Sequence, residues 1–339
     1  MSSKSIARAR QALRTSTSMF RRKVEAALPV SLSKKGQKKR REFAAAPGSL
    51  ADDGARLLAG DTLIDELAKH HERTKNTDTR HFLVTFCWDA GLRSIEPPHD
   101  LELKAMRLKV YKALQKMSMH GIGVFEISPM RGSKGEAPRF LVHAHVIGWT
   151  GDPWLQPKTA AKALNATGSF PNSFGAPGVT ILSRKMAGKN FRNKKSEAYD
   201  HLFSDLHRDQ TKASLAWMGY YLMQAPAYVK QVCPDKRKPG KTVMRSNYTN
   251  YSPQLALSLH GLLNEIPIKD AVFSVGKEGR LVGGAWRKEF NARVKKASVD
   301  PRDKAGRGKL FRSKVRRRPS KLLRRLPIAV GSLQREAKL

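Results

Sequence analysis

The apolar pattern is most informative at residues 140–148, where Phe-Leu-Val-His-Ala-His-Val-Ile-Gly carries two histidines inside an otherwise apolar run. Successive side chains of a β-strand point to opposite faces, so His143 and His145 share one face. Because both faces are otherwise apolar, the run predicts a central strand that is covered on both sides. The pattern therefore predicts two ring nitrogens side by side in the protein interior, near the end of that strand.

The rest of the pattern predicts further strands and helices along the chain. Runs rich in β-branched and aromatic residues predict strands at 81–88, 123–128, 178–183 and 271–275. Helical spacing of apolar residues predicts helices at 61–71, 101–117, 157–165, 212–224 and 255–263.

Glu126 is an acidic residue in the otherwise apolar strand 123–128. The segment 129–138 is long enough to form the loop of a hairpin between this strand and the histidine strand. In an antiparallel pair, Glu126 lies beside the face that carries His143 and His145. We therefore expect Glu126 to be a third, oxygen ligand, although an isolated strand glutamate is more often an edge or solvent-facing residue.

Two imidazoles and one carboxylate with open coordination positions suit Mg²⁺ or Mn²⁺ acting on phosphate oxygens, and would also suit Zn²⁺ or Fe²⁺. The alternative interpretation is a pair of core histidines whose hydrogen bonds are satisfied within the protein. The charge of the chain favours the metal site, because a strongly basic protein meets phosphodiesters.

The chain contains 65 Lys and Arg against 28 Asp and Glu, which gives a formal net charge of +37. Such a balance favours nucleic acid as the partner, with a membrane surface as the alternative. No apolar run approaches the roughly 18 residues that span a bilayer, so we expect a soluble protein. Cys87 and Cys233 are the only cysteines, which excludes a disulfide framework and favours a reducing compartment.

Basic residues concentrate near both ends of the chain, with dense runs at 34–41 and 312–325. Such runs are typical of flexible arms that neutralise phosphates, or simply of solvated tails. The Arg- and Ser-rich start also has the composition of an organellar transit peptide, which we consider the weaker interpretation.

The predicted helix 212–224 gathers Trp217, Tyr220, Tyr221 and Gln224 on one side. Such a face is either a packing surface or a wall that carries a nucleophile above a site. For aromatic residues on a helix, packing is the more common role.

Along the chain, the strand 81–88 is followed by Glu126, by the His143-Ala144-His145 pair and by the tyrosine-bearing helix. This order and spacing resemble those of the HUH endonucleases, specifically the rolling-circle replication initiators of plasmids and phages. The resemblance covers roughly residues 80–230. It implies the α+β class, with a central antiparallel sheet of about five strands flanked by helices and with basic N- and C-terminal extensions.

The basic runs at the two ends, together with the resemblance, predict how the chain is divided. A nuclease domain at 61–265 would follow a basic, flexible N-terminal arm at 1–60. A small basic region with a disordered tail would then occupy 266–339.

In that family a divalent ion binds the histidine pair and a nearby polar residue, and a tyrosine attacks DNA. The resemblance therefore assigns His143, His145 and Glu126 to Mg²⁺ or Mn²⁺. It makes Tyr221 the nucleophile and Tyr220 a second phenol for strand transfer, with the choice between the two left open. The tyrosines follow the histidine pair, as in replication initiators, whereas the tyrosine of relaxases precedes it.

Two positions depart from the family pattern. The residue between the histidines is usually bulky, whereas Ala144 is small and is expected to loosen the packing behind the ligands. The family helix often reads Tyr-x-x-Lys-Tyr, whereas Trp217 here replaces the first tyrosine and Tyr220 replaces the lysine.

The resemblance implies an enzyme that nicks single-stranded origin DNA and leaves a 5′-phosphotyrosine and a free 3′-OH for rolling-circle replication. The sequence holds no Walker-type phosphate loop, so a host helicase and polymerase would be needed as partners. The reaction would take place in the bacterial cytoplasm, away from membranes. A transposase with the same chemistry and a non-catalytic basic nucleic-acid-binding protein remain alternatives, and the oligomeric state stays open. We expect the DNA contacts to come from Arg184, Lys185, Lys189, Lys230, Lys236, Arg237 and Lys238.

Overall fold

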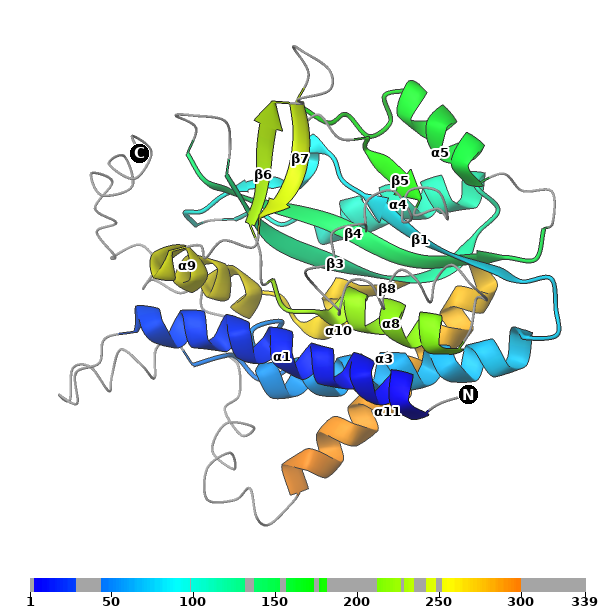
Figure 1. Ribbon diagram of the computed structural model, residues 1–339, viewed down its shortest axis with the longest axis horizontal. Coiled ribbons are helices and arrows are strands. Elements are labelled where there is room, and N and C mark those ends of the chain that lie inside the picture. The colour runs from blue at the N-terminus through cyan, green and yellow to red at the C-terminus, as the bar shows by residue number, and fades with distance from the viewer. Residues whose placement is uncertain are drawn as a thin grey trace.

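The protein belongs to the α+β class, as predicted, with one sheet flanked by helices (Figure 1). No helix among the described residues combines the length and the apolar character needed to cross a bilayer. The computed structural model describes residues 3–28, 44–97, 99–131, 137–152, 157–173, 177–181, 212–226, 229–234, 242–247 and 252–299.

The centre of the sheet is the hairpin of β3 (His120–Arg131) and β4 (Arg139–Thr150), which are paired along almost their whole length. Both strands are almost entirely buried, as the apolar character of both faces predicts. Four further strands extend this hairpin by antiparallel pairing. β1 (Arg80–Phe86) and β2 (Leu92–Ser94) pair with β4, and β8 (Val272–Val275) pairs with β3. β5 (Val179–Ile181) pairs with β1.

A second hairpin, β6 (Val229–Pro234) and β7 (Thr242–Asn247), extends the sheet from the far end of β3. β6 pairs with β3 in parallel, with Lys230 opposite Met130. The sheet is therefore mixed, whereas we expected it to be antiparallel. The sequence pattern does not predict this hairpin, because polar and basic residues interrupt the apolar alternation of both strands.

Helices cover both faces of the sheet. In Figure 1, α1, α3 and α8 lie below the sheet, and α5 lies above it. The helix bounds are α1 Ser3–Ala27, α3 Asp53–Thr74, α4 Leu103–Lys116, α5 Pro157–Ala166, α8 Lys212–Met223, α9 Pro253–Asn264, α10 Ile268–Ala271 and α11 Gly276–Val299, with a short 3-10 turn at Asp89–Gly91.

Residues 3–27, which we expected to form part of a flexible arm, are a helix that packs against α3, α8 and α9. Ala9, Leu13, Phe20 and Val24 lie on one side of α1 at helical spacing and are buried. Leu13, Phe20 and Val24 belong to the same apolar core as the sheet, which explains why this basic segment is folded.

The C-terminal part of the described chain belongs to the same packed unit. β8 pairs with β3, and Trp286 of α11 donates a hydrogen bond of 3.1 Å to the carbonyl of Ala59 in α3. The predicted boundaries at residues 60 and 265 therefore do not coincide with breaks in the packing. The predicted tail beyond residue 299 lies outside the described residues.

Asp65 of α3 joins the two basic helices at the ends of the described chain. Its carboxylate accepts hydrogen bonds from Arg10 of α1 at 2.5 Å and from Arg293 of α11 at 2.9 Å. Arg10 also lies 3.4 Å from Asp61. These arginines are thus paired with acidic groups of the protein itself.

Candidate metal centre

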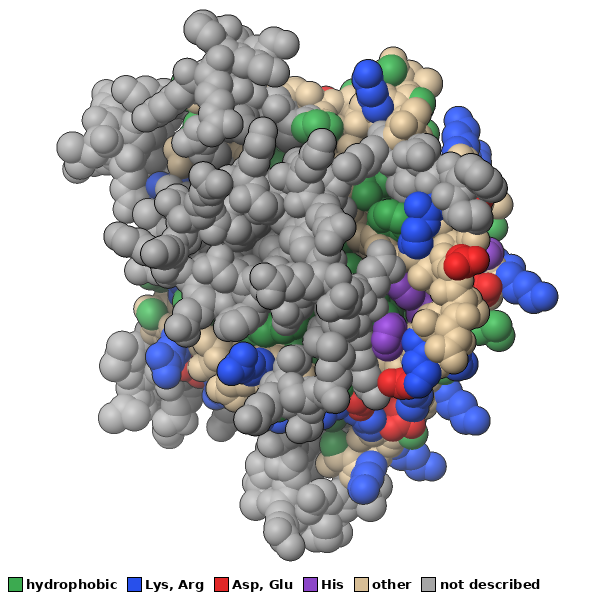
Figure 2. Space-filling view, turned by 45° about the vertical axis from the view of Figure 1, so that its right-hand side comes forward, with side chains coloured by type: hydrophobic (Ala, Val, Ile, Leu, Met, Phe, Trp, Pro, Cys, Tyr) green, Lys and Arg blue, Asp and Glu red, His purple; other side chains and the backbone are tan. Residues whose placement is uncertain are grey.

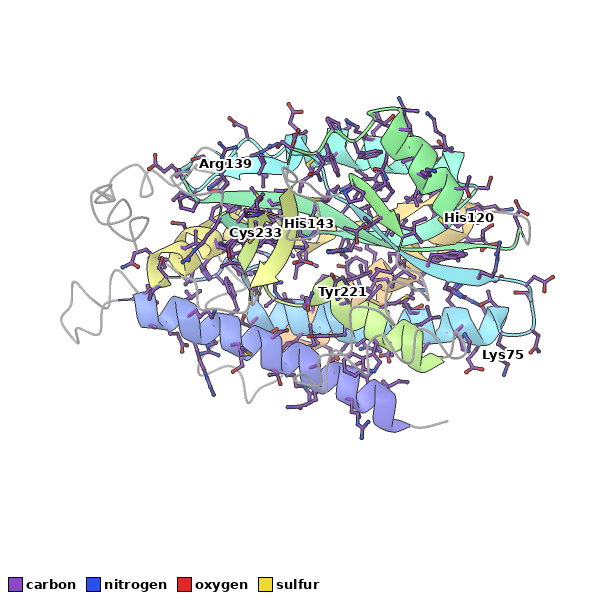
Figure 3. The ribbon with its side chains drawn as sticks, turned by 45° about the horizontal axis from the view of Figure 1, so that its top comes forward. Lys75, His120, Arg139, His143, Tyr221 and Cys233 are labelled. Carbon is purple, nitrogen blue, oxygen red and sulfur yellow. The ribbon has the colours of Figure 1, made fainter. Side chains whose placement is uncertain are left out.

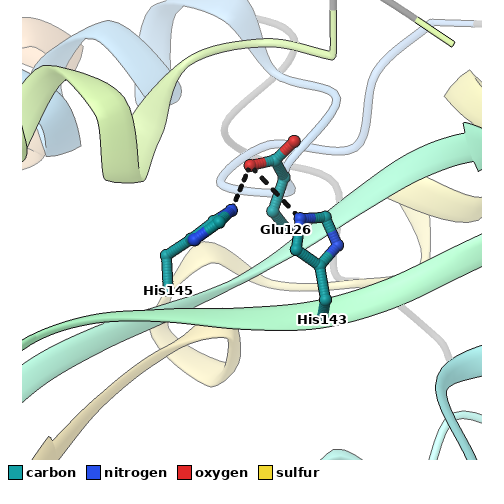
Figure 4. Close-up of side chains that lie close together, drawn as sticks. All are labelled: Glu126, His143 and His145. Carbon is teal, nitrogen blue, oxygen red and sulfur yellow. Dashed lines mark ion pairs between the residues drawn. The ribbon is translucent and has the colours of Figure 1, made fainter. Parts of the chain in front are cut away.

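The register of the central hairpin brings Glu126 and the two histidines together. Glu126 lies directly opposite His143 in the antiparallel ladder, and His145 is two residues further on the same face. All three side chains are buried, and their ligand atoms lie within 4.8 Å of one another (Figure 4). The structure thus places these three residues as the sequence pattern predicted.

The separations between the ligand atoms fit a small divalent ion. Oε2 of Glu126 lies 3.0 Å from Nε2 of His145 and 3.7 Å from Nε2 of His143. Two ligands that bind one ion at about 2.1 Å and at right angles are about 3 Å apart. The three groups can therefore converge on one ion with little rearrangement.

Neighbouring groups orient both imidazoles for coordination through Nε2. Nδ1 of His143 lies 3.2 Å from the carbonyl oxygen of Leu141, which can only accept, so Nδ1 carries the proton. Nδ1 of His145 lies 2.8 Å from Oγ1 of Thr85, which can accept in the same way. When Oγ1 of Thr85 accepts from Nδ1 of His145, both Nε2 atoms present a lone pair to the site, the arrangement found in metal-binding histidines.

The alternative of satisfied core histidines fits less well. Nε2 of His143 is buried, and no hydrogen bond to it is found among the described residues. Nε2 of His145 lies at hydrogen-bonding distance, 3.0 Å, from Oε2 of Glu126. Buried polar atoms are normally hydrogen-bonded, so a buried ring nitrogen without such a bond beside a buried carboxylate favours a site that binds a ligand.

The electrostatics of the site favour neutral imidazoles and an ionised carboxylate. Burial lowers the pKa of His143 well below 6.5 and also lowers the pKa of His145. Burial by itself raises the pKa of Glu126, but His143, His145 and Lys230 outweigh it, so that the net pKa of this carboxyl is lowered. Ser128 donates a hydrogen bond of 2.8 Å to Oε1 of Glu126, which leaves Oε2 facing the imidazoles.

Helix α8 brings a tyrosine to this group. The ring of Tyr221 packs against the ring of His145, with centroids 4.8 Å apart and planes at 70°. Figure 3 shows Tyr221 on α8, below the strand that carries His143. Tyr220 instead packs edge-on against Trp217, with centroids 5.5 Å apart. Tyr221 is therefore in contact with a candidate ligand, as its predicted role requires.

The two departures from the family pattern are accommodated by packing. Ala144 is fully buried and pairs with Phe86 on one side and Phe125 on the other, so the bulk behind the ligands comes from the neighbouring strands. The expected loosening at Ala144 is thus compensated. Trp217 belongs to a buried cluster with Ile64 of α3 and Ala9 of α1, which gives it a structural role in fixing α8.

Lys230 is the predicted DNA-binding residue whose position is described. It lies in β6 and is buried, with 8% of its surface exposed. On the face drawn in Figure 2, the described Lys and Arg side chains are interspersed with Asp and Glu. The other predicted DNA contacts lie outside the described residues: Arg184, Lys185, Lys189, Lys236, Arg237 and Lys238.

The resemblance to the HUH endonucleases rests on the order of the residues in the sequence. The geometry of the three ligands and Tyr221 is compatible with it but is not specific to that family. Comparisons of the chain with family models, with curated proteins and with solved structures gave no match.

Proposed function

We propose that the protein is a metal-dependent endonuclease of the HUH type, which nicks single-stranded origin DNA with a tyrosine and thereby starts rolling-circle replication. The observation that carries this proposal is the convergence of Glu126, His143, His145 and the ring of Tyr221 on one side of the sheet. A buried carboxylate–imidazole group beside a phenol is a candidate functional site, and a strongly basic chain favours a phosphodiester substrate.

The residues divide the reaction between them. His143, His145 and Glu126 would hold Mg²⁺ or Mn²⁺, and such an ion would withdraw charge from the scissile phosphate. The phenol oxygen of Tyr221 attacks the phosphorus, and its proton passes to a neighbouring base. The bond from phosphorus to the 3′ oxygen breaks, so that a 5′-phosphotyrosine forms and the 3′ oxygen leaves as a hydroxyl after it takes up a proton. Tyr220 is the candidate second phenol for strand transfer.

The products explain how the nick would be used. The free 3′-OH primes synthesis, and the phosphotyrosine stores the energy of the broken bond for later rejoining, so that no nucleotide hydrolysis is needed. Unwinding and synthesis fall to a host helicase and polymerase. We place this reaction in the bacterial cytoplasm, on a plasmid or phage replicon.

The deciding experiment looks for the covalent intermediate. Purified full-length protein is incubated with end-labelled single-stranded oligonucleotides tiled across the replicon that encodes it, with Mn²⁺ or with EDTA. The proposal requires a denaturation-resistant adduct that carries the 3′ fragment, needs Mn²⁺ and disappears when both Tyr220 and Tyr221 are replaced by phenylalanine. Tight binding without any adduct in Mg²⁺, Mn²⁺ or Zn²⁺ supports the non-catalytic DNA-binding protein instead.

A transposase with the same chemistry would form the same adduct. The two are separated by genetics: a replicon that persists only while the gene is intact supports the initiator. Movement of the flanking DNA to new sites supports the transposase.

A further inference from the structure

Ser128 of β3 is a buried serine beside the candidate ligands that the reaction above does not use. Its exposed fraction is 0%, and it follows Glu126 by two residues on the same strand, so the two side chains share a face. Its hydroxyl donates a hydrogen bond of 2.8 Å to Oε1 of Glu126. A buried hydroxyl normally needs a partner, and the partner of this one is the side chain of a candidate ligand.

The two oxygens of the Glu126 carboxylate have different surroundings. Oε2 lies 3.0 Å from Nε2 of His145 and 3.7 Å from Nε2 of His143. In Figure 4 both dashed lines end on the same carboxylate oxygen, and the other oxygen points away from the histidines. That other oxygen, Oε1, is the one that accepts from Ser128. The hydrogen bond therefore fixes the rotation of the carboxylate, with one oxygen turned toward the imidazoles.

This arrangement favours a carboxylate that binds an ion through one oxygen. A cation that moved toward Oε1 would approach the positive end of the Ser128 hydroxyl, which points at this oxygen. Ser128 has no exposed surface, so solvent offers no replacement acceptor, and a buried hydroxyl that lost its partner would be unfavourable. Glu126 is thus set up to contribute Oε2 alone.

The number of carboxylate oxygens affects which ion binds and what else can bind to it. Mg²⁺ and Mn²⁺ prefer octahedral sites with about six ligands, whereas Ca²⁺ takes roughly six to eight oxygens and often both oxygens of one carboxylate. An octahedral ion held by one atom from each of Glu126, His143 and His145 keeps about three positions for water or phosphate oxygens. A second oxygen from Glu126 would fill one of these positions and would make the site more suitable for Ca²⁺.

We propose that Ser128 is a positioning residue of the candidate metal centre: it holds Glu126 as a one-oxygen ligand. This keeps coordination positions open for the substrate phosphate and disfavours Ca²⁺. The inference rests on the proposed function, which supplies the ion and the phosphate that would use the open positions. Ser128 acts through Glu126 and contacts neither the ion nor the DNA.

The test separates the choice of ion from the stability of the site. Ser128→Ala removes the hydroxyl, and Ser128→Thr keeps it. Ser16→Ala is the matched control, because Ser16 is another buried serine, 6% exposed, whose hydroxyl donates to the carbonyl of Leu13 in α1. The electron paramagnetic resonance of free Mn²⁺ gives the Mn²⁺ affinity, and competition with Mn²⁺ gives the Ca²⁺ affinity. The relaxation of water protons reports the waters on the bound Mn²⁺.

We expect Ser128→Ala to lower the ratio of Mn²⁺ affinity to Ca²⁺ affinity by about tenfold, the strength of one hydrogen bond to a charged group. It should also lower the relaxation enhancement by about a third, because Oε1 displaces one of about three waters. Ser128→Thr should stay close to the wild type in both measurements, and Ser16→Ala should match it. If Ser128→Ala does not fold, Ser128→Cys, whose thiol is a weak donor, should show both changes in the same direction.

An unchanged affinity ratio or an unchanged relaxation in the variant without the hydroxyl overturns the inference. An equal loss of both affinities also overturns it, because Ser128 would then be a structural support.

The outcomes distinguish the inference from the proposed function. Wild-type protein that binds no Mn²⁺ overturns both. Wild-type protein that binds Mn²⁺ with the expected effect of Ser128→Ala, yet forms no DNA adduct, supports the inference and refutes the endonuclease.

Discussion

Thr85 and His145 are joined across strands β1 and β4 by a contact of 2.8 Å between Oγ1 and Nδ1. The contact orients the imidazole, and when Oγ1 accepts from Nδ1 the lone pair on Nε2 faces the site. Partners of this kind affect metal binding although they do not touch the metal.

Replacing Thr85 with valine keeps the shape of the side chain but removes its oxygen. We expect the affinity for Mn²⁺ to fall about 10- to 100-fold, because the ring of His145 loses its partner. Thr85→Ser, which keeps the hydroxyl, should retain most of the affinity. Titration with Mn²⁺ measures both, and equal binding by the valine variant would show that the contact does not tune the site.

Metal binding should stabilise the folded protein through Glu126. At a Mn²⁺ concentration of about 100 times Kd, the free energy of unfolding should rise by about 2.7 kcal/mol, and EDTA should reverse the gain. Glu126→Gln removes the charged ligand with little change in volume, so most of the gain should vanish. Urea denaturation with and without Mn²⁺ gives the comparison; the same gain in both proteins would place the ion elsewhere.

The two tyrosines should differ in the covalent step. Tyr221→Phe should reduce adduct formation by about 1000-fold or more, because it removes the proposed nucleophilic oxygen and keeps the ring that packs against His145. Tyr220→Phe should retain the adduct, since Tyr220 packs against Trp217. Denaturing gels of labelled DNA report both, and the opposite result would transfer the role of nucleophile to Tyr220.

Helix α1 should contribute substantially to stability. Phe20 is 2% exposed, and Phe20→Ala should lower the free energy of unfolding by about 3 kcal/mol or more. Its neighbour Met19 is 46% exposed, so Met19→Ala should change it by less than about 0.5 kcal/mol. Chemical denaturation of both variants tests whether α1 is part of the core; small effects in both would contradict that packing.

His70 should make the protein less stable in acid. It is buried with its ring centroid 4.3 Å from that of Trp149, and burial lowers its pKa from 6.5 to about 4. Between these values only the unfolded chain takes up the proton, so stability should fall as the pH decreases, by about 2 kcal/mol at pH 5. Above pH 6.5 both states are neutral and the effect disappears.

The variant His70→Phe isolates this contribution. Other buried histidines, such as His260, titrate in the wild type and in the variant alike. Urea denaturation at pH 7.5 and at pH 5 should therefore show a smaller pH dependence in the variant. An unchanged dependence would show that His70 is protonated in the folded protein.

The candidate ligands could be predicted from the sequence because strand geometry is local. Alternation alone places His143 and His145 on one face, and one hairpin places Glu126 beside them. The contact between Tyr221 and His145 depends instead on the angle at which α8 crosses the sheet. That angle is set by packing against α1 and α3, which no local pattern encodes.

Two basic segments show where sequence patterns fail. The charges along α1 favour a solvated arm, but its apolar residues at helical spacing are sufficient for packing. Lys230 resembles any lysine of a basic stretch until β6 pairs with β3, a contact between residues far apart in the chain. Burial of a charged residue is decided by such long-range pairing.

The carboxylate of Asp65, shared by Arg10 and Arg293, limits how the high net charge can be used. A guanidinium group already neutralised within the protein releases few counterions when a polyanion approaches. The salt dependence of DNA affinity should therefore be shallower than the excess of basic residues implies. Its slope should reflect only the basic side chains that are not already paired with acidic groups of the protein.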